Sequence, residues 1–288
     1  MFMLLVAIGW MYVVVMMAVA EAVHPNGTVL GAFMTLLLYG VAPLAVVLYI
    51  MGTPGRRAAR QAKNQIQSRA NVAAVLLAAG AGSRMGHQAK GLLEFEGQPL
   101  VQRQVQVLRE AGVGEVVVVL GHYADAVQAA LLANPETADV RCVRHAQPNV
   151  GQEASVRLGL QAVTPGMHGV VLALVDQPLM TAADVVALLH AFEHRGERAM
   201  VVPRVKHTDG SHQPGNPVVI EAALAKQWLA QEQPPMGREW RAAHPDQVCW
   251  MDTVNTHYTC DLDTPQDLER LRQQTSQRAP NAGPGASS

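Results

Sequence analysis

The sequence contains few charged and few aromatic residues for its length. Only 16% of its 288 residues are charged and 5% are aromatic, whereas soluble domains carry roughly 25% charged residues. The formal net charge is −1 and the mean hydropathy is +0.10. A disordered chain is excluded, because disorder requires low hydropathy and high net charge. A chain of this length is expected to form one large or two small domains.

Cysteine is also scarce, with three residues at Cys142, Cys249 and Cys260. They form no C-x-x-C pair and their number is odd, so neither a disulfide framework nor a zinc ribbon is predicted. This usage fits a reducing compartment. Loop histidines such as His122 lack the spacing of a zinc motif and are predicted to be surface or loop residues rather than ligands.

Apolar residues are concentrated at the amino end. Residues 1–54 contain one charged residue, Glu21, which separates apolar runs at 1–20 and 29–51. Each run has about the 20 residues that a helix needs to cross a bilayer. The sequence therefore predicts two transmembrane helices within residues 1–54. A cleaved signal peptide is the alternative for the first run, which however lacks a basic amino end and has no small-x-small site followed by a polar mature sequence.

Basic residues follow the second apolar run. Residues 55–70 contain five arginines and lysines and no acidic residue, which predicts a basic juxtamembrane linker in contact with membrane lipid. By the positive-inside rule, we expect a two-pass protein of the inner membrane with its large domain in the cytoplasm. The rest of the chain is mildly acidic, so no nucleic-acid partner is predicted. The polar tail at 275–288 is predicted to be disordered.

Between residues 71 and 274, short apolar runs alternate with amphipathic segments. Continuous apolar runs are typical of parallel strands that are covered on both faces. Strands are predicted at 72–78, 115–120, 140–143, 169–175, 199–203 and 217–220, and helices at 100–111, 124–133, 152–162 and 182–194. The alternation predicts an α/β fold with a Rossmann-like, doubly wound, mostly parallel sheet, preceded by the transmembrane hairpin. In such sheets ligands bind beyond the carboxyl ends of the strands.

The loop after the first predicted strand is rich in glycine and basic residues. Gly80 and Gly82 let backbone N–H groups approach an anion, and Arg84 and Lys90 add positive charge where a polyphosphate would lie. The loop lacks the Gly-Lys-Ser/Thr of a P-loop and misses the G-x-G-x-x-G spacing of dinucleotide-binding proteins. A glycine-rich turn with solvated basic side chains is the alternative interpretation.

These residues belong to a longer pattern that resembles a known family. The segment LAAGAGSRMGHQAKGLL, residues 77–93, is similar to the signature of MobA-like NTP transferases, in particular the molybdenum-cofactor cytidylyltransferase branch. Four later segments match the family in order: NVGQEASVRLG at 149–159, DQP at 176–178, GNP at 215–217 and DLDTPQDL at 261–268. The resemblance covers residues 72–274. Where the family has a Gly-Asp-x-Gly segment near the acceptor site, this chain has Pro-Pro-Met-Gly-Arg at 234–238.

The resemblance implies a fold of the nucleotide-diphospho-sugar transferase type and a set of site residues. Arg84 and Lys90 would hold the triphosphate as catalytic residues, and Asp176 would bind Mg²⁺, which prefers carboxylate and phosphate oxygens. Asp261 or Asp263 would supply a second metal ligand, although either could instead cap the last helix. The nucleotide would bind to Leu77, Ala78, Ala79, Gly80, Gly82, Asn149 and Ser155.

The implied reaction joins the α-phosphate of a nucleoside triphosphate to a phosphate on a small acceptor and releases pyrophosphate. The Ala-Ala-Gly at 78–80 favours CTP, whereas the Lys-Gly-Leu-Leu at 90–93 also resembles the guanylyl branch. A CTP:molybdopterin cytidylyltransferase is thus predicted. The alternatives are a GTP-using or a sugar- or alcohol-phosphate nucleotidyltransferase, and a non-catalytic nucleotide-binding accessory protein that has a molybdoenzyme as its partner.

Overall fold

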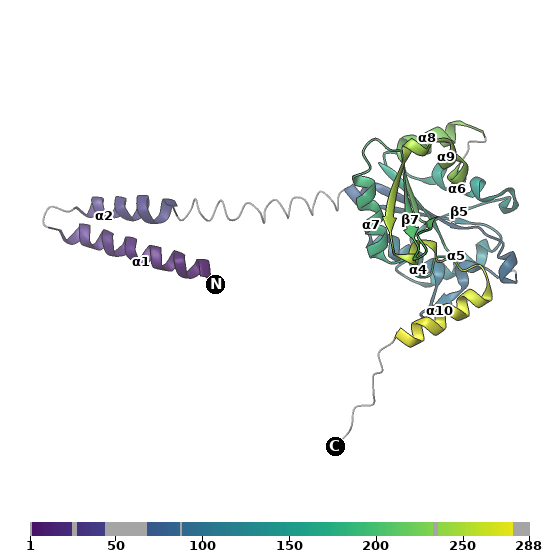
Figure 1. The fold of residues 1–288 in the computed structure, drawn as a ribbon, viewed down its shortest axis with the longest axis horizontal. Coiled ribbons are helices and arrows are strands. Elements are labelled where there is room, and N and C mark those ends of the chain that lie inside the picture. The colour runs from purple at the N-terminus through teal and green to yellow at the C-terminus, as the bar shows by residue number, and fades with distance from the viewer. Residues whose placement is uncertain (1, 25–27, 44–67, 87, 233–235, 279–288) are drawn as a thin grey trace, which may run out of the picture. The chain divides into compact units, whose positions relative to one another are not determined.

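The chain divides into two compact units, residues 1–65 and 66–288. A computed structural model describes residues 2–24, 28–43, 68–86, 88–232 and 236–278 (Figure 1). Within these ranges the side chains of residues 2–8, 84 and 274–278 are not described. Most of the predicted juxtamembrane linker, residues 55–67, therefore lies outside the described residues.

The first unit is a pair of contacting helices. Helix α1 (Phe2–Val23) packs against α2 (Val29–Thr35) and against the π-helix over Leu36–Val41 that continues α2. The indole Nε1 of Trp10 donates a hydrogen bond to the Tyr39 carbonyl oxygen at 3.0 Å. The Thr28 hydroxyl accepts a hydrogen bond from the Gly31 amide and caps α2. The two predicted helices thus form, but their lengths differ from the prediction.

The prediction of a membrane anchor is wrong. Among the described residues, no helix combines the length and the apolarity needed to span a bilayer. The second apolar run does not form one long α-helix, because α2 ends at Thr35 and the chain continues as a π-helix. The predicted transmembrane hairpin and the inner-membrane location are corrected accordingly. Residues 44–51 of that run, and most of the linker predicted to contact lipid, lie outside the described residues.

The second unit is built on one large sheet. Its strands are β1 (Val72–Ala78), β4 (Glu115–Leu120), β5 (Arg141–Arg144), β6 (Gly169–Leu174), β7 (Met200–Lys206), β8 (His212–Pro214), β9 (Val218–Glu221) and β10 (Val248–Thr253). A separate hairpin consists of β2 (Glu94–Phe95) and β3 (Gln98–Pro99). The helices are α4 (Leu100–Glu110), α5 (Ala124–Ala133), α6 (Gln152–Ala162), α7 (Ala182–Glu193), α8 (Ala222–Ala230), α9 (Gly237–Ala243) and α10 (Pro265–Arg278).

The sheet has eight strands in the order β10-β7-β9-β6-β1-β4-β5, with β8 added beside β7. Strands β1, β4, β5 and β6 run parallel, as predicted. Strand β9 is antiparallel to both β6 and β7, and β8 is antiparallel to β7. The predicted α/β fold is confirmed, and the sheet, predicted to be mostly parallel, is mixed. From β1 the chain moves outward to β5 and then returns to β6 on the other side of β1, which places the switch in strand order beside β1.

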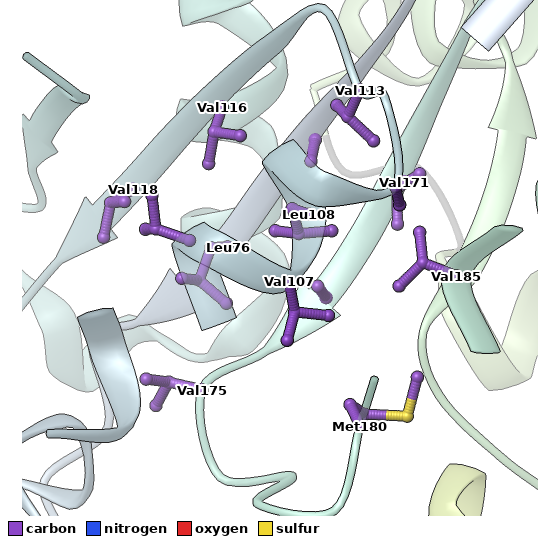
Figure 2. Close-up of a cluster of buried hydrophobic side chains, with 14 of the residues drawn as sticks. Leu76, Val107, Leu108, Val113, Val116, Val118, Val171, Val175, Met180 and Val185 are labelled. Carbon is purple, nitrogen blue, oxygen red and sulfur yellow. The ribbon is translucent and has the colours of Figure 1, made fainter. Parts of the chain in front are cut away.

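Hydrophobic cores cover both faces of the central strands. On one face, Leu76 of β1 packs in a cluster with Leu108 of α4 (Figure 2). On the other face, Val75 of β1 shares a second cluster with Leu160 of α6 and Trp228 of α8. Successive residues of a strand point to opposite faces, so a strand between two cores must be apolar at every position. This is why the parallel strands appear as continuous apolar runs.

Local signals placed several helix ends correctly. Helices α5 and α6 begin and end at the predicted residues, and Thr181 forms the expected capping box with Asp184 at the start of α7. The β2–β3 hairpin, β8, β10, α8 and α9 were not predicted. Helix α10 continues to Arg278, past the predicted end of the domain at residue 274. Residues 279–288 of the predicted tail lie outside the described residues.

Candidate active site

The principal cavity lies at the carboxyl ends of the central parallel strands. It has a volume of ≈ 410 Å³ and is lined by the loops that follow β1, β4, β5 and β6, together with Asp263 before α10. Because the carboxyl ends of parallel strands meet at one edge of the sheet, residues far apart in the chain come together there. Most of the residues predicted to bind nucleotide line this cavity: Leu77, Ala78, Ala79, Gly80, Gly82 and Ser155.

The glycine-rich loop has a backbone that only glycine accommodates at position 82. Gly82 has φ +57°, and a Cβ atom there would lie 2.0 Å from the Gln88 carbonyl oxygen. A short 3-10 turn, Ser83–Met85, follows and buries Met85. Within the part of the chain that the structure describes, no hydrogen bond uses the amide N–H groups of Gly80, Ala81 and Gly82. These amides are therefore available to an anion in the cavity.

A histidine and a tyrosine after β4 hold the glycine-rich loop in place. His122 Nδ1 lies 3.1 Å from the Ala79 carbonyl oxygen, and its Nε2 lies 2.8 Å from Asn149 Oδ1. The Tyr123 hydroxyl donates to the Ala81 carbonyl oxygen at 3.3 Å. His122 was predicted to be a surface or loop residue without a specific role. The sequence signal for a role at the site was the position of His122 in the loop after β4, because such loops face the ligand-binding edge of the sheet.

Lys90 joins two of the predicted metal-binding carboxylates. Its Nζ donates to Asp176 Oδ2 at 2.7 Å and to Asp263 Oδ1 at 2.8 Å. Lys90 starts a 3-10 turn after the glycine-rich loop, Asp176 follows β6, and Asp263 precedes α10. The side chains of Lys90 and Asp176 are 18% exposed. Burial alone would lower the pKa of Lys90, but its hydrogen bonds to both carboxylates and their charges outweigh burial and raise this pKa above its ordinary value.

Three of the sequence motifs meet beside this cluster. The Tyr258 carbonyl oxygen accepts hydrogen bonds from the Asn216 amide at 2.8 Å and from Gln177 Nε2 at 3.2 Å. The Leu262 amide donates to the Asp176 carbonyl oxygen at 2.8 Å. The D-Q-P, G-N-P and D-L-D motifs therefore share one hydrogen-bonded junction, which fixes Asp263 next to Asp176.

The carboxylates fit a divalent cation that is completed by phosphate oxygens. Asp176 Oδ1 is buried and has no hydrogen-bond partner, and leaving a buried charged acceptor unpaired costs roughly 1–3 kcal/mol or more. The described residues contain no group of three or more His, Cys, Asp or Glu side chains arranged around a metal. The protein would then supply one or two carboxylates, which is the usual number for Mg²⁺ at a phosphate substrate.

Asp261, the other predicted metal ligand, does not line the cavity. Desolvation by the surrounding chain and the negative charge of Asp176 raise the pKa of Asp261 to about 6, even though the residue keeps contact with solvent. It is therefore close enough to Asp176 to feel its charge. Asp263, in contrast, lines the cavity and contacts Lys90 directly.

The remaining predictions are distributed around the cavity. The backbone of Arg84 lies in the 3-10 turn of the glycine-rich loop, and its side chain is outside the described part of the chain. Asn149 is exposed and contacts His122 without lining the cavity. Sequence reasoning missed Tyr123 and Gln152, which do line it. Gln152 belongs to the matched segment 149–159, so the motif located the segment but not this side chain.

Doubly wound proteins bind nucleotides in a crevice beside the point where the strand order reverses. The cavity lies at this point of the sheet, so the fold and the site are those of a nucleotide-binding α/β protein. The family model of the MobA-like NTP transferase domain matches residues 74–248. The chain therefore belongs to the MobA-like NTP transferase family, and it is a nucleotidyltransferase.

The chain resembles several known proteins, one of which is named an oxidoreductase rather than a nucleotidyltransferase. Nicotine blue oxidoreductase from Paenarthrobacter nicotinovorans is 36% identical over 160 residues, which cover 53% of this chain and 72% of that protein. The Rv0371c homologue from Mycobacterium sp. strain JC1 has 25% identity and a TM-score of 0.57, and the match covers 73% of this chain and 98% of that one. Rv0371c from Mycobacterium tuberculosis H37Rv, solved in complex with manganese, has 25% identity and a TM-score of 0.51 over 70% of this chain and 98% of that one.

Proposed function

We propose that this nucleotidyltransferase is a Mg²⁺-dependent CTP:molybdopterin cytidylyltransferase that acts in molybdenum cofactor biosynthesis. The observation that carries the proposal is the convergence of Lys90, Asp176 and Asp263 at a cavity lined by the glycine-rich loop. Two anions, a triphosphate and an acceptor phosphate, must be brought together in this reaction. A site that provides an ammonium group, open backbone amides and metal-binding carboxylates meets that requirement.

In the proposed reaction an oxygen of the acceptor phosphate attacks the α-phosphorus of the nucleotide. A new P–O bond forms, the bond from the α-phosphorus to the bridging oxygen breaks, and pyrophosphate leaves with that electron pair. No redox change and no covalent enzyme intermediate are needed. The acceptor phosphate carries no proton that must be removed at neutral pH, so the site needs positive charge rather than a general base.

The chain's residues have separate tasks in this reaction. The amides of Gly80 and Gly82 bind phosphate oxygens, while Arg84 and Lys90 neutralise the charge that builds up on the leaving pyrophosphate. Asp176, with Asp263, would hold Mg²⁺, which supplies Lewis-acid stabilisation of the same charge. Leu77, Ala78 and Ala79 line the cavity beside the phosphate-binding loop, and buried Ser155 on α6 also lines it, where we place the base.

The choice of CTP and of molybdopterin depends on the sequence motifs. The Ala-Ala-Gly at 78–80 favours a cytidylyl over a guanylyl transferase, and the resemblance of residues 72–274 favours the molybdenum-cofactor branch. A sugar- or alcohol-phosphate acceptor and a non-catalytic accessory of a molybdoenzyme are the alternatives that the test must separate.

The test is a substrate screen with purified full-length protein. CTP, GTP and ATP are each incubated with Mg²⁺ and molybdopterin, and pyrophosphate release is measured beside the binding of each nucleotide by calorimetry. We expect release with CTP that requires both Mg²⁺ and molybdopterin. Release with a sugar phosphate instead, or tight CTP binding without any turnover, would reject the proposed acceptor or the enzymatic role of this particular site.

A further inference from the structure

We propose that Lys90 competes with the divalent cation for the carboxylates of Asp176 and Asp263, so that metal and nucleotide bind with strong positive coupling. The inference rests on the proposed function and concerns how the same site is loaded. Lys90 would hold the carboxylates in the metal-free protein and move to the triphosphate when metal and nucleotide enter together.

The contacts of Lys90 are the first argument. Its ammonium group lies 2.7 Å from Asp176 Oδ2 and 2.8 Å from Asp263 Oδ1, so it bridges the two carboxylates that would hold the metal. Charge-assisted hydrogen bonds of this length are about twice as strong as neutral ones. Mg²⁺ would approach the same oxygens to roughly 2.0–2.1 Å. A divalent cation bound to these carboxylates would lie close to the ammonium group of Lys90 and be repelled by it, so metal binding displaces Lys90 from them.

The second argument is that Lys90 has another anion site within reach. Lys90 lines the same cavity as Gly80 and Gly82, whose amide groups donate no hydrogen bond within the described part of the chain. A lysine side chain is a flexible four-carbon stem that carries a compact charge, so its Nζ can move from the carboxylates to a phosphate in that cavity while its backbone stays in place. A triphosphate carries more negative charge than two carboxylates and would therefore compete for the ammonium group.

The third argument concerns Asp176 itself. Its Oδ1 is buried and unpaired, although Lys90 satisfies Oδ2. Lys90 thus neutralises the charge of Asp176 but leaves its Oδ1 without a partner, so this oxygen can bind the cation. A metal ion that binds alone displaces the ammonium group of Lys90 into the cavity, where that group has no new partner. When nucleotide binds with the metal, a phosphate becomes the new partner of Lys90.

Thermodynamic linkage makes the inference measurable. If nucleotide raises the affinity for metal, metal must raise the affinity for nucleotide by the same factor. Replacing Lys90 with a neutral side chain of similar length should free the carboxylates. Metal should then bind without nucleotide, and the coupling should shrink.

The experiment measures Mn²⁺ binding to full-length protein by the EPR signal of free Mn²⁺, with and without CTP and in the absence of any acceptor. Without CTP, we expect Lys90→Met to bind Mn²⁺ at least about tenfold more tightly than the wild type, since the metal no longer has to displace the two charge-assisted hydrogen bonds of Lys90, either of which is worth about this factor. Adding CTP should raise the affinity for Mn²⁺ in the wild type and change it little in Lys90→Met. Lys226→Met, an exposed lysine on α8, is the matched control and should behave as the wild type.

Two further variants keep the outcomes distinct. Lys90→Gln replaces Lys90→Met if the latter does not fold, as judged by thermal unfolding. Asp176→Asn combined with Lys90→Met should abolish the gained Mn²⁺ binding. Equal affinity for Mn²⁺ in the wild type and Lys90→Met without CTP, with binding still dependent on Asp176, would overturn the competition while leaving the proposed function intact. Mn²⁺ binding that never depends on Asp176 would overturn the metal site and the inference together.

Discussion

Individual charges decide the chemistry of this site. Asp176 is the only site carboxylate that combines a contact to Lys90 with a second oxygen that is buried and unpaired among the described residues. A buried carboxylate oxygen without a partner is stabilised when a cation or a hydrogen-bond donor approaches it. Asp176 is therefore the residue at which a change of charge without a change of shape is most informative.

We expect Asp176→Asn to reduce Mg²⁺-dependent turnover by about two orders of magnitude or more, because the metal loses its main carboxylate ligand. The fold should persist, since asparagine has the same shape and Lys90 keeps its contact with Asp263. Steady-state pyrophosphate release and thermal unfolding measure the two effects. Asp209→Asn, in an exposed loop, is the control. Near-normal turnover of Asp176→Asn would contradict the ligand role.

Asp261 predicts a pH dependence of stability. Desolvation and the charge of Asp176 raise its pKa from 3.8 to about 6 in the folded protein, so the folded state binds this proton more tightly than the unfolded state. The stabilisation that protonation provides is present at low pH and is lost as the pH rises through about 6. In the presence of a chelator, the unfolding temperature of Asp261→Asn should vary less with pH between 5 and 7.5 than that of the wild type. Parallel profiles for the two proteins would refute this assignment.

At the scale of elements, the glycine-rich loop is shaped by backbone geometry rather than by side chains. Gly82 needs a positive φ and also a position without Cβ, because the Gln88 carbonyl oxygen occupies that space. Gly80 differs, since nothing lies within 4 Å of the place where its Cβ would be. Gly82 is therefore required by the fold of the loop, whereas a side chain at position 80 would conflict only with a bound ligand.

Gly82→Ala should lower the free energy of unfolding by at least about 1–2 kcal/mol, the cost of a left-handed backbone with a Cβ, because the steric conflict adds to it. Gly80→Ala should leave the stability of the free protein within about 0.5 kcal/mol and weaken nucleotide binding, because its methyl group would point into open space at the cavity. Chemical denaturation and CTP titration of both variants test this pair. A stable Gly82→Ala protein would show that the loop can adopt another backbone.

At the scale of the whole molecule, the nucleotidyltransferase unit has its own cores on both faces of its sheet. The chain enters this unit just before β1, where the Ser68 carbonyl oxygen accepts from the Asn71 amide and the Asn71 carbonyl oxygen accepts from His168. Contacts within residues 66–288 therefore account for the packing of the catalytic unit.

A fragment of residues 66–288 should fold cooperatively and bind CTP with the affinity of the full chain. Its unfolding temperature should match the transition that full-length protein shows for this unit, because no core residue of the sheet is removed. Thermal unfolding and calorimetric titration of fragment and full chain provide the comparison. A fragment that fails to fold or to bind CTP would mean that residues 1–65 contribute to the catalytic unit.

The apolar amino end shows where pattern reading fails. Counting residues in an apolar run assumes that the whole run forms one straight helix. The second run instead changes from α-helix to π-helix after Thr35. The hydrogen bond from Trp10 to the Tyr39 carbonyl oxygen joins this π-helix to α1. A count of apolar residues cannot predict such a contact between two segments.

Sequence alone determined the features that depend on neighbouring residues. Continuous apolar runs identified β1, β4 and β6, the Thr181–Asp184 spacing identified the start of α7, and the ordered motifs identified Lys90 and Asp176 as site residues. Tertiary structure alone decided that β9 enters the sheet antiparallel, that His122 links Ala79 to Asn149, and that Lys90 bridges two carboxylates from distant segments. The physical reason is that local pattern records which face of an element is buried, whereas partners brought together by chain topology are set by the packing of the whole domain.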